Sequence, residues 1–162
     1  MNYVKKIGAS IYDPKDLKIV FSKFTPEIIQ APINIFDNRI LSSKWFGILK
    51  KKKIIIQARS IFLQGLLTKK ISILKKIITN RSFLLKIKKL DSWCNLNKIS
   101  RLEACLNFIK SINEVNILTF GINSPDELIE ILDILKKKKN IAFIDFSTKK
   151  LEIIDPRKWK NK

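Results

Sequence analysis

Short apolar blocks recur along the chain, and each is followed by a segment with helical spacing. The blocks predict four β-strands, at residues 6–12, 28–33, 54–59 and 117–120. The second and third blocks are apolar through their length, so we expect a sheet covered on both faces. Strands that alternate with helices are typical of an α/β protein with parallel strands and right-handed crossovers.

The first and last predicted helices have the clearest pattern. Their apolar residues recur at i, i+3, i+4 and i+7, which makes one stripe for burial against a sheet. We expect Asp13 and Ser124 to be the N-caps, because Pro14 and Pro125 follow them at the first helical position. The stripes are Leu17, Val20, Phe21 and Phe24 in one helix and Leu128, Ile131, Leu132 and Leu135 in the other.

Two more helical stripes lie between these ends, and a mixed tail follows. We expect a loop at residues 60–70, extra helices at 71–111, and a possible short strand at 141–146. Trp159 is predicted to pack the tail onto the domain, which gives a domain at residues 1–139 and a tail at 140–162. The stripes are Leu41, Trp45 and Ile48 in the first helix, and Leu102, Cys105, Leu106 and Ile109 in a helix after Ser100.

The composition removes several classes of function. The chain has 162 residues, 46% of them hydrophobic, which suits one domain with a sizeable core. It has no His, so the commonest general base and every His-containing metal site are excluded, and we expect no metal. Cys94 and Cys105 form no CxxC motif and are expected to be reduced, packed thiols. The start lacks the apolar core of a signal peptide and no apolar run reaches membrane-span length, which indicates a cytoplasmic protein.

Positive charge is concentrated in the middle of the chain. The formal net charge is +19, and residues 50–90 hold thirteen basic residues and no acidic one. Lysines on a solvated helix face, or a basic amphipathic helix at residues 71–90, would explain this segment. It would also attract phosphate groups on a dinucleotide, a sugar nucleotide or RNA.

Four motifs, in order and in register, resemble the second half of an aldo/keto reductase barrel. The family places a Gly-x-Ser strand, a Gln-x-Pro-x-Asn strand, a loop ending Gly-Leu-Leu, and a last Gly before the final barrel helix. The corresponding segments here are Gly8-Ala9-Ser10, Gln30-Ala31-Pro32-Ile33-Asn34, Ser60 to Gly65-Leu66-Leu67, and Gly121 with Ser124-Pro125.

This resemblance implies a partial (β/α)8 barrel of about four parallel βα units, with a site at the carboxyl ends of the strands. The family reduces carbonyl groups with NADPH, and its catalytic Asp, Tyr, Lys and His come from the first four strands. The chain would therefore be a truncated or split NADP-dependent oxidoreductase that is inactive alone and has no catalytic residues of its own. A separately encoded amino-terminal half, or a second copy, would be its partner; alternatively, the chain would be the remnant of a truncated gene and have no functional partner, which is the alternative we favour from the sequence.

The resemblance also assigns cofactor-binding positions. Ser10 and Gln30 match residues that hydrogen-bond the nicotinamide carboxamide, although such residues often pair only with neighbouring backbone. Arg59 stands where many relatives have an aromatic residue that stacks on nicotinamide, and its charge would disfavour the oxidised ring. The remaining predicted cofactor contacts are Ser60, Leu63 and Gly65 at the pyrophosphate, and Gly121 and Ser124 at a phosphate near the last helix.

Several features argue for weak or lost NADP(H) binding. Asn123 and Glu127 replace the Arg and Gln that relatives use for the adenosine 2′-phosphate and adenine, and Gly121 also suits a tight turn. The competing function is a non-catalytic basic module that binds RNA or another polyanion. We do not expect a nucleic-acid partner, because Phe62 and Phe83 are the only aromatic residues in the basic segment. We expect no membrane partner, because the apolar residues of 71–90 serve equally well as a stripe that faces the barrel.

Overall fold

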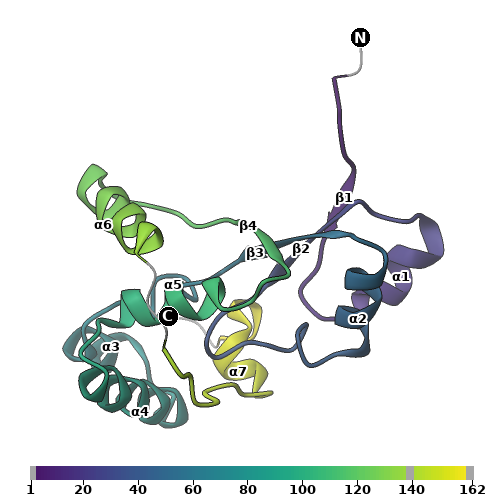
Figure 1. Cartoon of the computed structure of the whole chain (residues 1–162). Helices are drawn as coiled ribbons and strands as arrows, with labels where there is room; N and C mark the ends of the chain where they lie inside the picture. The colour runs from purple at the N-terminus through teal and green to yellow at the C-terminus, as the bar shows by residue number, and fades with distance from the viewer. Residues whose placement is uncertain (1–2, 138–140, 160–162) are drawn as a thin grey trace.

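The computed structural model describes residues 3–137 and 141–159, which form an α/β structure around one sheet (Figure 1). The sheet has four strands in the order β1-β2-β3-β4, and all neighbouring strands are parallel. The predicted α/β class is therefore confirmed. The strands are β1 (Gly8–Ser10), β2 (Ile28–Pro32), β3 (Ile55–Arg59) and β4 (Val115–Leu118).

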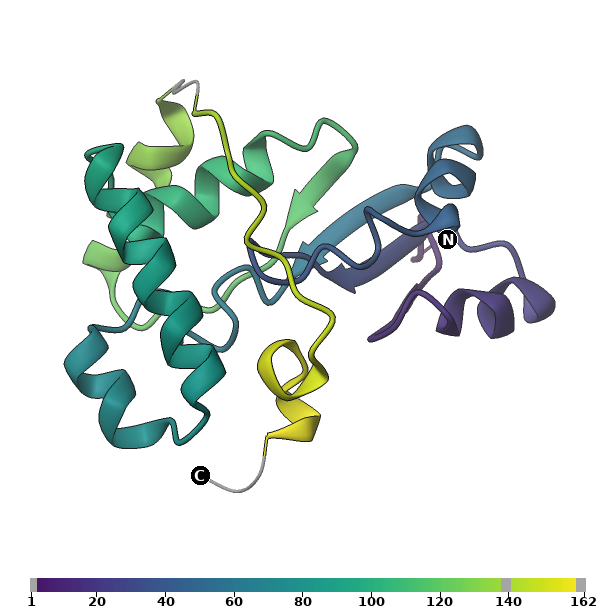
Figure 2. The same ribbon diagram turned by 90° about the horizontal axis from the view of Figure 1, so that it is seen from below.

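The helices form two groups, with α1 and α2 on one side and α3, α4 and α5 on the other (Figure 2). The predicted loop after β3 and the extra helices that follow it are confirmed. No helix among the described residues is long and apolar enough to cross a membrane. The bounds are α1 (Asp16–Lys23), α2 (Lys44–Lys51), α3 (Ile71–Ile77), α4 (Arg81–Leu96), α5 (Arg101–Lys110), α6 (Pro125–Lys136), α7 (Leu151–Ile154) and a 3-10 turn η1 (Pro156–Lys158).

The two faces of the sheet differ in burial. Along β2 and β3, Ile29, Ala31, Ile56 and Ala58 are buried in the core. Of their neighbours in the strands, which point to the other face, Pro32 is buried and the rest are half-buried, while Gly8 and Ser10 of β1 are exposed. The expectation of a sheet covered on both faces was wrong, because side chains alternate between the faces and the second face is largely open.

Of the two predicted N-caps, Ser124 begins a helix as expected and Asp13 does not. Ser124 caps α6, and Ser100 forms a capping box with Glu103 at the start of α5. The predicted helix start at Asp13 was wrong, because α1 begins at Asp16, although Asp13 Oδ1 accepts the Lys15 N–H at 2.9 Å. Asp13 instead forms a turn before the helix, in which its main-chain oxygen accepts the Asp16 N–H at 3.0 Å.

The last strand lies two residues earlier than predicted. β4 spans 115–118 rather than 117–120, although the Thr119 N–H still donates to the Ala58 oxygen at 2.8 Å. The pairing with β3 is irregular, because the side-chain oxygen of Asn116 accepts the Ile56 N–H at 3.0 Å. This bulge moves the regular ladder toward the start of the strand.

The tail packs through aromatic residues and forms no strand at 141–146, so that prediction was wrong. The rings of Phe143 and Phe146 lie 5.2 and 5.5 Å from the ring of Trp93. Lys86 Nζ donates to the main-chain oxygen of Phe146 at 2.6 Å, which removes that group from ladder pairing. Trp159 packs against the core as predicted. The predicted domain boundary at 139/140 lies outside the described residues and stays a prediction.

Candidate functional site

Polar side chains form a row across the sheet near the carboxyl ends of the strands. Ser10 of β1 is in register with Gln30 of β2, and Gln30 with Gln57 of β3. The Ser10 hydroxyl donates to Gln30 Oε1 at 2.8 Å, and Gln57 Nε2 donates to the Thr119 hydroxyl at 2.6 Å. Ser10, Gln30 and Gln57 line a shallow pocket on the open face of the sheet.

Ser10 and Gln30 were predicted from the sequence, whereas Gln57 and Thr119 were missed. A signal for Gln57 was present, since β2 reads Ile-Ile-Gln-Ala-Pro and β3 reads Ile-Ile-Gln-Ala-Arg. The glutamine has the same place in both pentapeptides, and the strands pair without offset. Thr119 follows the end of β4, where the sequence has no comparable repeat.

The pairing of Ser10 with Gln30 leaves complementary groups free for a ligand. Among the residues that the structure describes, Gln30 Nε2 donates to no group and the Ser10 oxygen accepts from none. A primary amide presents one carbonyl acceptor and one NH2 donor, so it can bond to both side chains at once. The donor set therefore fits a carboxamide.

The loop after β3 has an unusual backbone. Ser60, Leu63, Gln64 and Gly65 have positive φ angles of 56°, 47°, 55° and 75°. Only Gly65 adopts this conformation without steric strain, so the other three are held by their surroundings. Leu63 is held by burial, because its side chain has no exposed area.

The same loop holds unpaired N–H groups. The Leu63 N–H donates to the Ser60 oxygen at 2.9 Å and is not available to a ligand. By contrast, the N–H groups of Ile61, Phe62, Gln64 and Gly65 donate to no group within the described residues. Backbone donors in a loop with left-handed residues form an anion-binding concavity. The loop therefore has the chemistry of a phosphate cradle.

Asn34 fixes this loop to the end of β2, and the sequence did not single it out as a site residue. It is 1% exposed, and its Oδ1 accepts the N–H groups of Phe36 and Asp37, both at 2.9 Å. Its Nδ2 donates to the main-chain oxygen of Ser60 at 3.1 Å. The start of the loop is thus positioned by a buried side chain.

Arg59 packs against Tyr12 at the carboxyl end of the sheet. The guanidinium carbons of Arg59 and Arg157 lie 4.0 and 3.8 Å from the centroid of the Tyr12 ring. Two such groups on one face would overlap, so they lie on opposite faces of the ring. Arg59 also donates to the Ile11 oxygen at 3.1 Å and to the Ser60 hydroxyl at 3.2 Å. The contact between Tyr12 and Arg157 of the tail was not predicted from the sequence.

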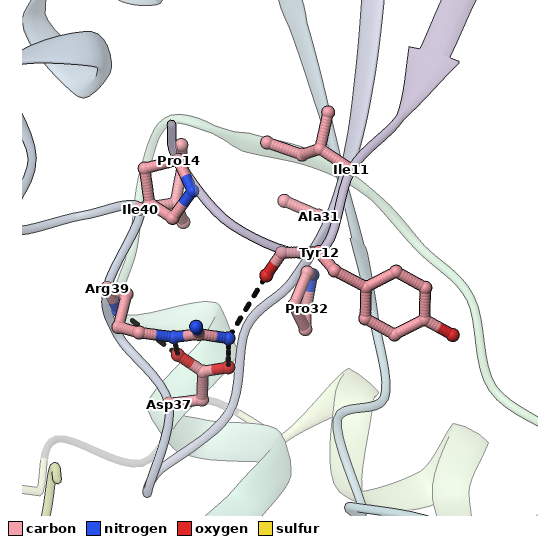
Figure 3. Close-up of a pocket in the computed structure, with 8 residues that line it drawn as sticks. All are labelled: Ile11, Tyr12, Pro14, Ala31, Pro32, Asp37, Arg39 and Ile40. Carbon is pink, nitrogen blue, oxygen red and sulfur yellow. Dashed lines mark hydrogen bonds and ion pairs between the residues drawn. The ribbon is translucent and has the colours of Figure 1, made fainter. Parts of the chain in front are cut away.

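A second arginine joins the turns after β1 and β2 (Figure 3). Arg39 pairs with Asp37 through two bonds of 2.8 and 2.9 Å, and donates to the Tyr12 oxygen at 3.0 Å. The bonds to Asp37 raise the pKa of Arg39 above its ordinary value. Arg39 therefore links the two turns, and Asp37 neutralises its charge.

Arg59 differs from the other two arginines in its charge environment. Asp155 forms an ion pair with Arg157 at 2.7 Å, and this pairing lowers the pKa of the Asp155 carboxyl. No carboxylate within the described residues pairs with Arg59. Its positive charge therefore remains available at the mouth of the site.

The start of α6 is already occupied by a carboxylate of the chain. Ser124 Oγ accepts the Glu127 N–H at 3.2 Å, and Glu127 Oε2 accepts the Asn123 N–H at 2.7 Å. Gly121 is exposed and does not have a positive φ angle. Because Glu127 accepts the Asn123 N–H and adds negative charge, it would disfavour a phosphate group at this end of α6.

The predicted residues thus fall into two parts. Ser10 bonds to Gln30, and Arg59 bonds to Ser60 in the loop that also holds Leu63 and Gly65. Gly121 and Ser124 make no hydrogen bond with any of them among the described residues, although Phe120 packs on Phe62 at 5.9 Å. The first part is a candidate site, and the second lies beside it.

Four parallel βα units with polar groups at the carboxyl ends of the strands define a protein of the (β/α)-barrel class. The sequence model of the aldo/keto reductase family matches residues 3–152, so the chain belongs to the aldo/keto reductase family. No curated protein matches the chain.

Solved structures show the same architecture. The aldo-keto reductase AKR11C1 from Bacillus halodurans superimposes with a TM-score of 0.62 in its apo form, at 16% identity, over 82% of this chain and 46% of the other. Its holo form gives 0.63 at 16% identity, over 83% and 45%. The chain therefore spans less than half the length of these structures, and the predicted partial barrel is confirmed.

Proposed function

We propose that this chain is the nicotinamide-nucleotide-binding part of an aldo/keto reductase barrel. The observation that carries the proposal is the pairing of Ser10 with Gln30, beside a loop that has free N–H groups. In this family the bound NADP(H) supplies or accepts the hydride. The residues of this chain bind and orient that nucleotide.

In this proposal, the contacts follow the order of the groups along a dinucleotide. Gln30 Nε2 and the Ser10 oxygen would hold the carboxamide, and Arg59 would lie against the nicotinamide. The loop from Ser60 to Gly65, with Leu63 as its buried anchor, would face the pyrophosphate. The thirteen basic residues of 50–90 would raise the local concentration of any phosphate ligand.

The adenosine end is expected to bind weakly. Gly121 and Ser124 stay proposed contacts, but Glu127 already bonds to Asn123 and would repel a 2′-phosphate. We therefore expect weak NADP(H) affinity, and little preference for NADPH over NADH.

We further propose that the chain does not reduce carbonyl groups by itself. Carbonyl reduction needs a proton donor beside the hydride acceptor, and the sequence has no His and only Tyr3 and Tyr12 as tyrosines. The Tyr12 ring is held between two guanidinium groups. The proton-donating residues would come from a partner that completes the barrel.

The test is a titration with NADPH followed by nucleotide fluorescence, using matched glutamine variants. Gln30→Met removes the amide that would hold the carboxamide, and we expect about tenfold weaker binding from one or two lost hydrogen bonds. Gln57→Met is the control, because Gln57 has the same place on the next strand. Equal effects of both variants, or no NADPH binding by the unaltered chain, would refute the proposal.

The competing function is binding of RNA by the basic segment. Its aromatic residues are buried, with Phe62 8% and Phe83 2% exposed, and so provide no surface on which bases could stack. Titration with RNA across a salt series separates the two functions. Salt-steep RNA binding without a response to nicotinamide nucleotides would favour the basic module.

A cytoplasmic location stays a prediction.

A further inference from the structure

Both edges of the sheet lack a neighbouring strand. β1 pairs only with β2, and β4 pairs only with β3, within the part of the chain that the structure describes. Apolar residues are exposed beside each edge, where Ile7 is 62% and Ile117 is 39% exposed. An unpaired edge with apolar side chains is a surface on which another strand can pair.

The open face of the sheet presents apolar area that a partner could bury. Ile28 and Ile55 lie half-buried on this face beside the row of polar side chains. Within that row, Ser10 is already bonded to Gln30, and Gln57 to Thr119. Burial would therefore gain apolar area, and a bound nucleotide could satisfy the polar groups of Gln30 and Ser10 that remain unpaired.

The helices that follow the two edge strands carry opposite charge. α6, which follows β4, has four carboxylates and one lysine. The segment 15–23, which contains α1 and follows β1, has three lysines and one aspartate. α6 also exposes apolar side chains, because Ile129 is 57% and Leu132 44% exposed. If two sets of four βα units formed one ring, the helix after the last strand of the first set would lie beside the first helix of the second set.

We infer that a second copy of this chain completes the barrel. A two-fold axis would pair β1 of each copy with β4 of the other, which closes eight parallel strands and places α6 of one copy beside α1 of its partner. The inference rests on the proposed function, because the open face becomes an enclosed nucleotide site only when the barrel closes. It departs from the family architecture of one chain per barrel.

The large positive charge does not oppose this arrangement locally. Its densest part, residues 50–90, lies mainly in the end of α2, the loop after β3, α3 and α4, whereas the edge helices are α1 and α6. At physiological salt, charges more than about 8 Å apart are largely screened. A second copy would also fill both edges at once with complementary charge.

Analytical ultracentrifugation of the full chain tests the inference through charge reversal. One variant carries Glu130→Lys and Asp133→Lys on α6, and the other Lys15→Glu and Lys18→Glu at α1. Each variant alone should dimerise about tenfold more weakly than the unaltered chain, because like charges would meet at both contacts. An equimolar mixture should regain the dimer, since both contacts then pair opposite charges. Glu152→Lys on α7 is the control and should dimerise normally.

The outcomes separate this inference from the proposed function. A folded monomer at every concentration, or a dimer that neither reversal weakens, would overturn the second-copy arrangement, and a monomer that instead binds another protein would point to a separately encoded half. NADPH titration is run on the same samples. A charge-sensitive dimer that binds no NADPH would refute the nucleotide site alone, whereas a monomer that binds NADPH would refute the dimer alone.

Discussion

Replacement of Asn34 by alanine should loosen the loop that forms the proposed phosphate cradle. The variant loses three side-chain hydrogen bonds, to the N–H groups of Phe36 and Asp37 and to the Ser60 oxygen. The Asp37 N–H still donates to the Asn34 main-chain oxygen, and the Ser60 oxygen still accepts the Leu63 N–H. Only the buried Phe36 N–H is left without its partner, so we expect a loss of about 3 kcal/mol in unfolding free energy.

Urea unfolding measures this loss. With an m-value of about 2 kcal/mol/M, the midpoint should fall by about 1.5 M urea. Asn34→Asp should be at least as destabilising, because a carboxylate oxygen would replace Nδ2 opposite the Ser60 carbonyl and lie near Asp37. Asn113→Ala is the control, since Asn113 is exposed and its side chain makes no hydrogen bond within the described part of the chain. A change below about 1 kcal/mol for Asn34→Ala would refute the assigned role of this side chain.

Three further predictions follow from the charges and thiols. Arg59→Phe should raise the affinity for the oxidised nucleotide relative to the reduced one by about threefold to thirtyfold, measured by calorimetry, because it removes a cation beside a positive ring. Arg157 lowers the pKa of Asp155, so the stability from this pair is present above the unfolded pKa of about 3.9 and is lost as the pH falls below it; Asp155→Asn should therefore flatten the acid limb of the stability profile. Burial raises the pKa of Cys94 to about 11 and of Cys105 to about 12, so a thiol reagent at neutral pH should label neither until the chain unfolds, and rapid labelling of the folded chain would contradict their placement.

The parallel βα architecture was predictable because its signals are local. The apolar stripe and the proline after Ser124 predicted α6. The apolar blocks predicted β2 and β3 to within one residue of their observed bounds. The errors lie where tertiary contacts override the local pattern. Asn116 enters the ladder and shifts β4, and aromatic packing on Trp93 replaces a strand in the tail.

The candidate site was predictable only in part. The family resemblance gave Ser10 and Gln30, and the structure places them in direct contact. The contact of Arg157 with the Tyr12 ring could not be predicted, because Arg157 is far from Tyr12 in the sequence and reaches it only after the tail folds back. The positive φ angles of Ser60, Leu63 and Gln64 were hidden as well, since these residue types rarely adopt them.

The most direct test of the nucleotide-binding claim is a nuclear magnetic resonance titration of the 15N-labelled chain with NADPH. We predict shifts of the Gln30 side-chain amide and of the Gly65 backbone amide that saturate together, with the side-chain amide of Gln57 less affected. Shifts confined to the lysine-rich helices α3 and α4, or no shifts at all, would contradict the account.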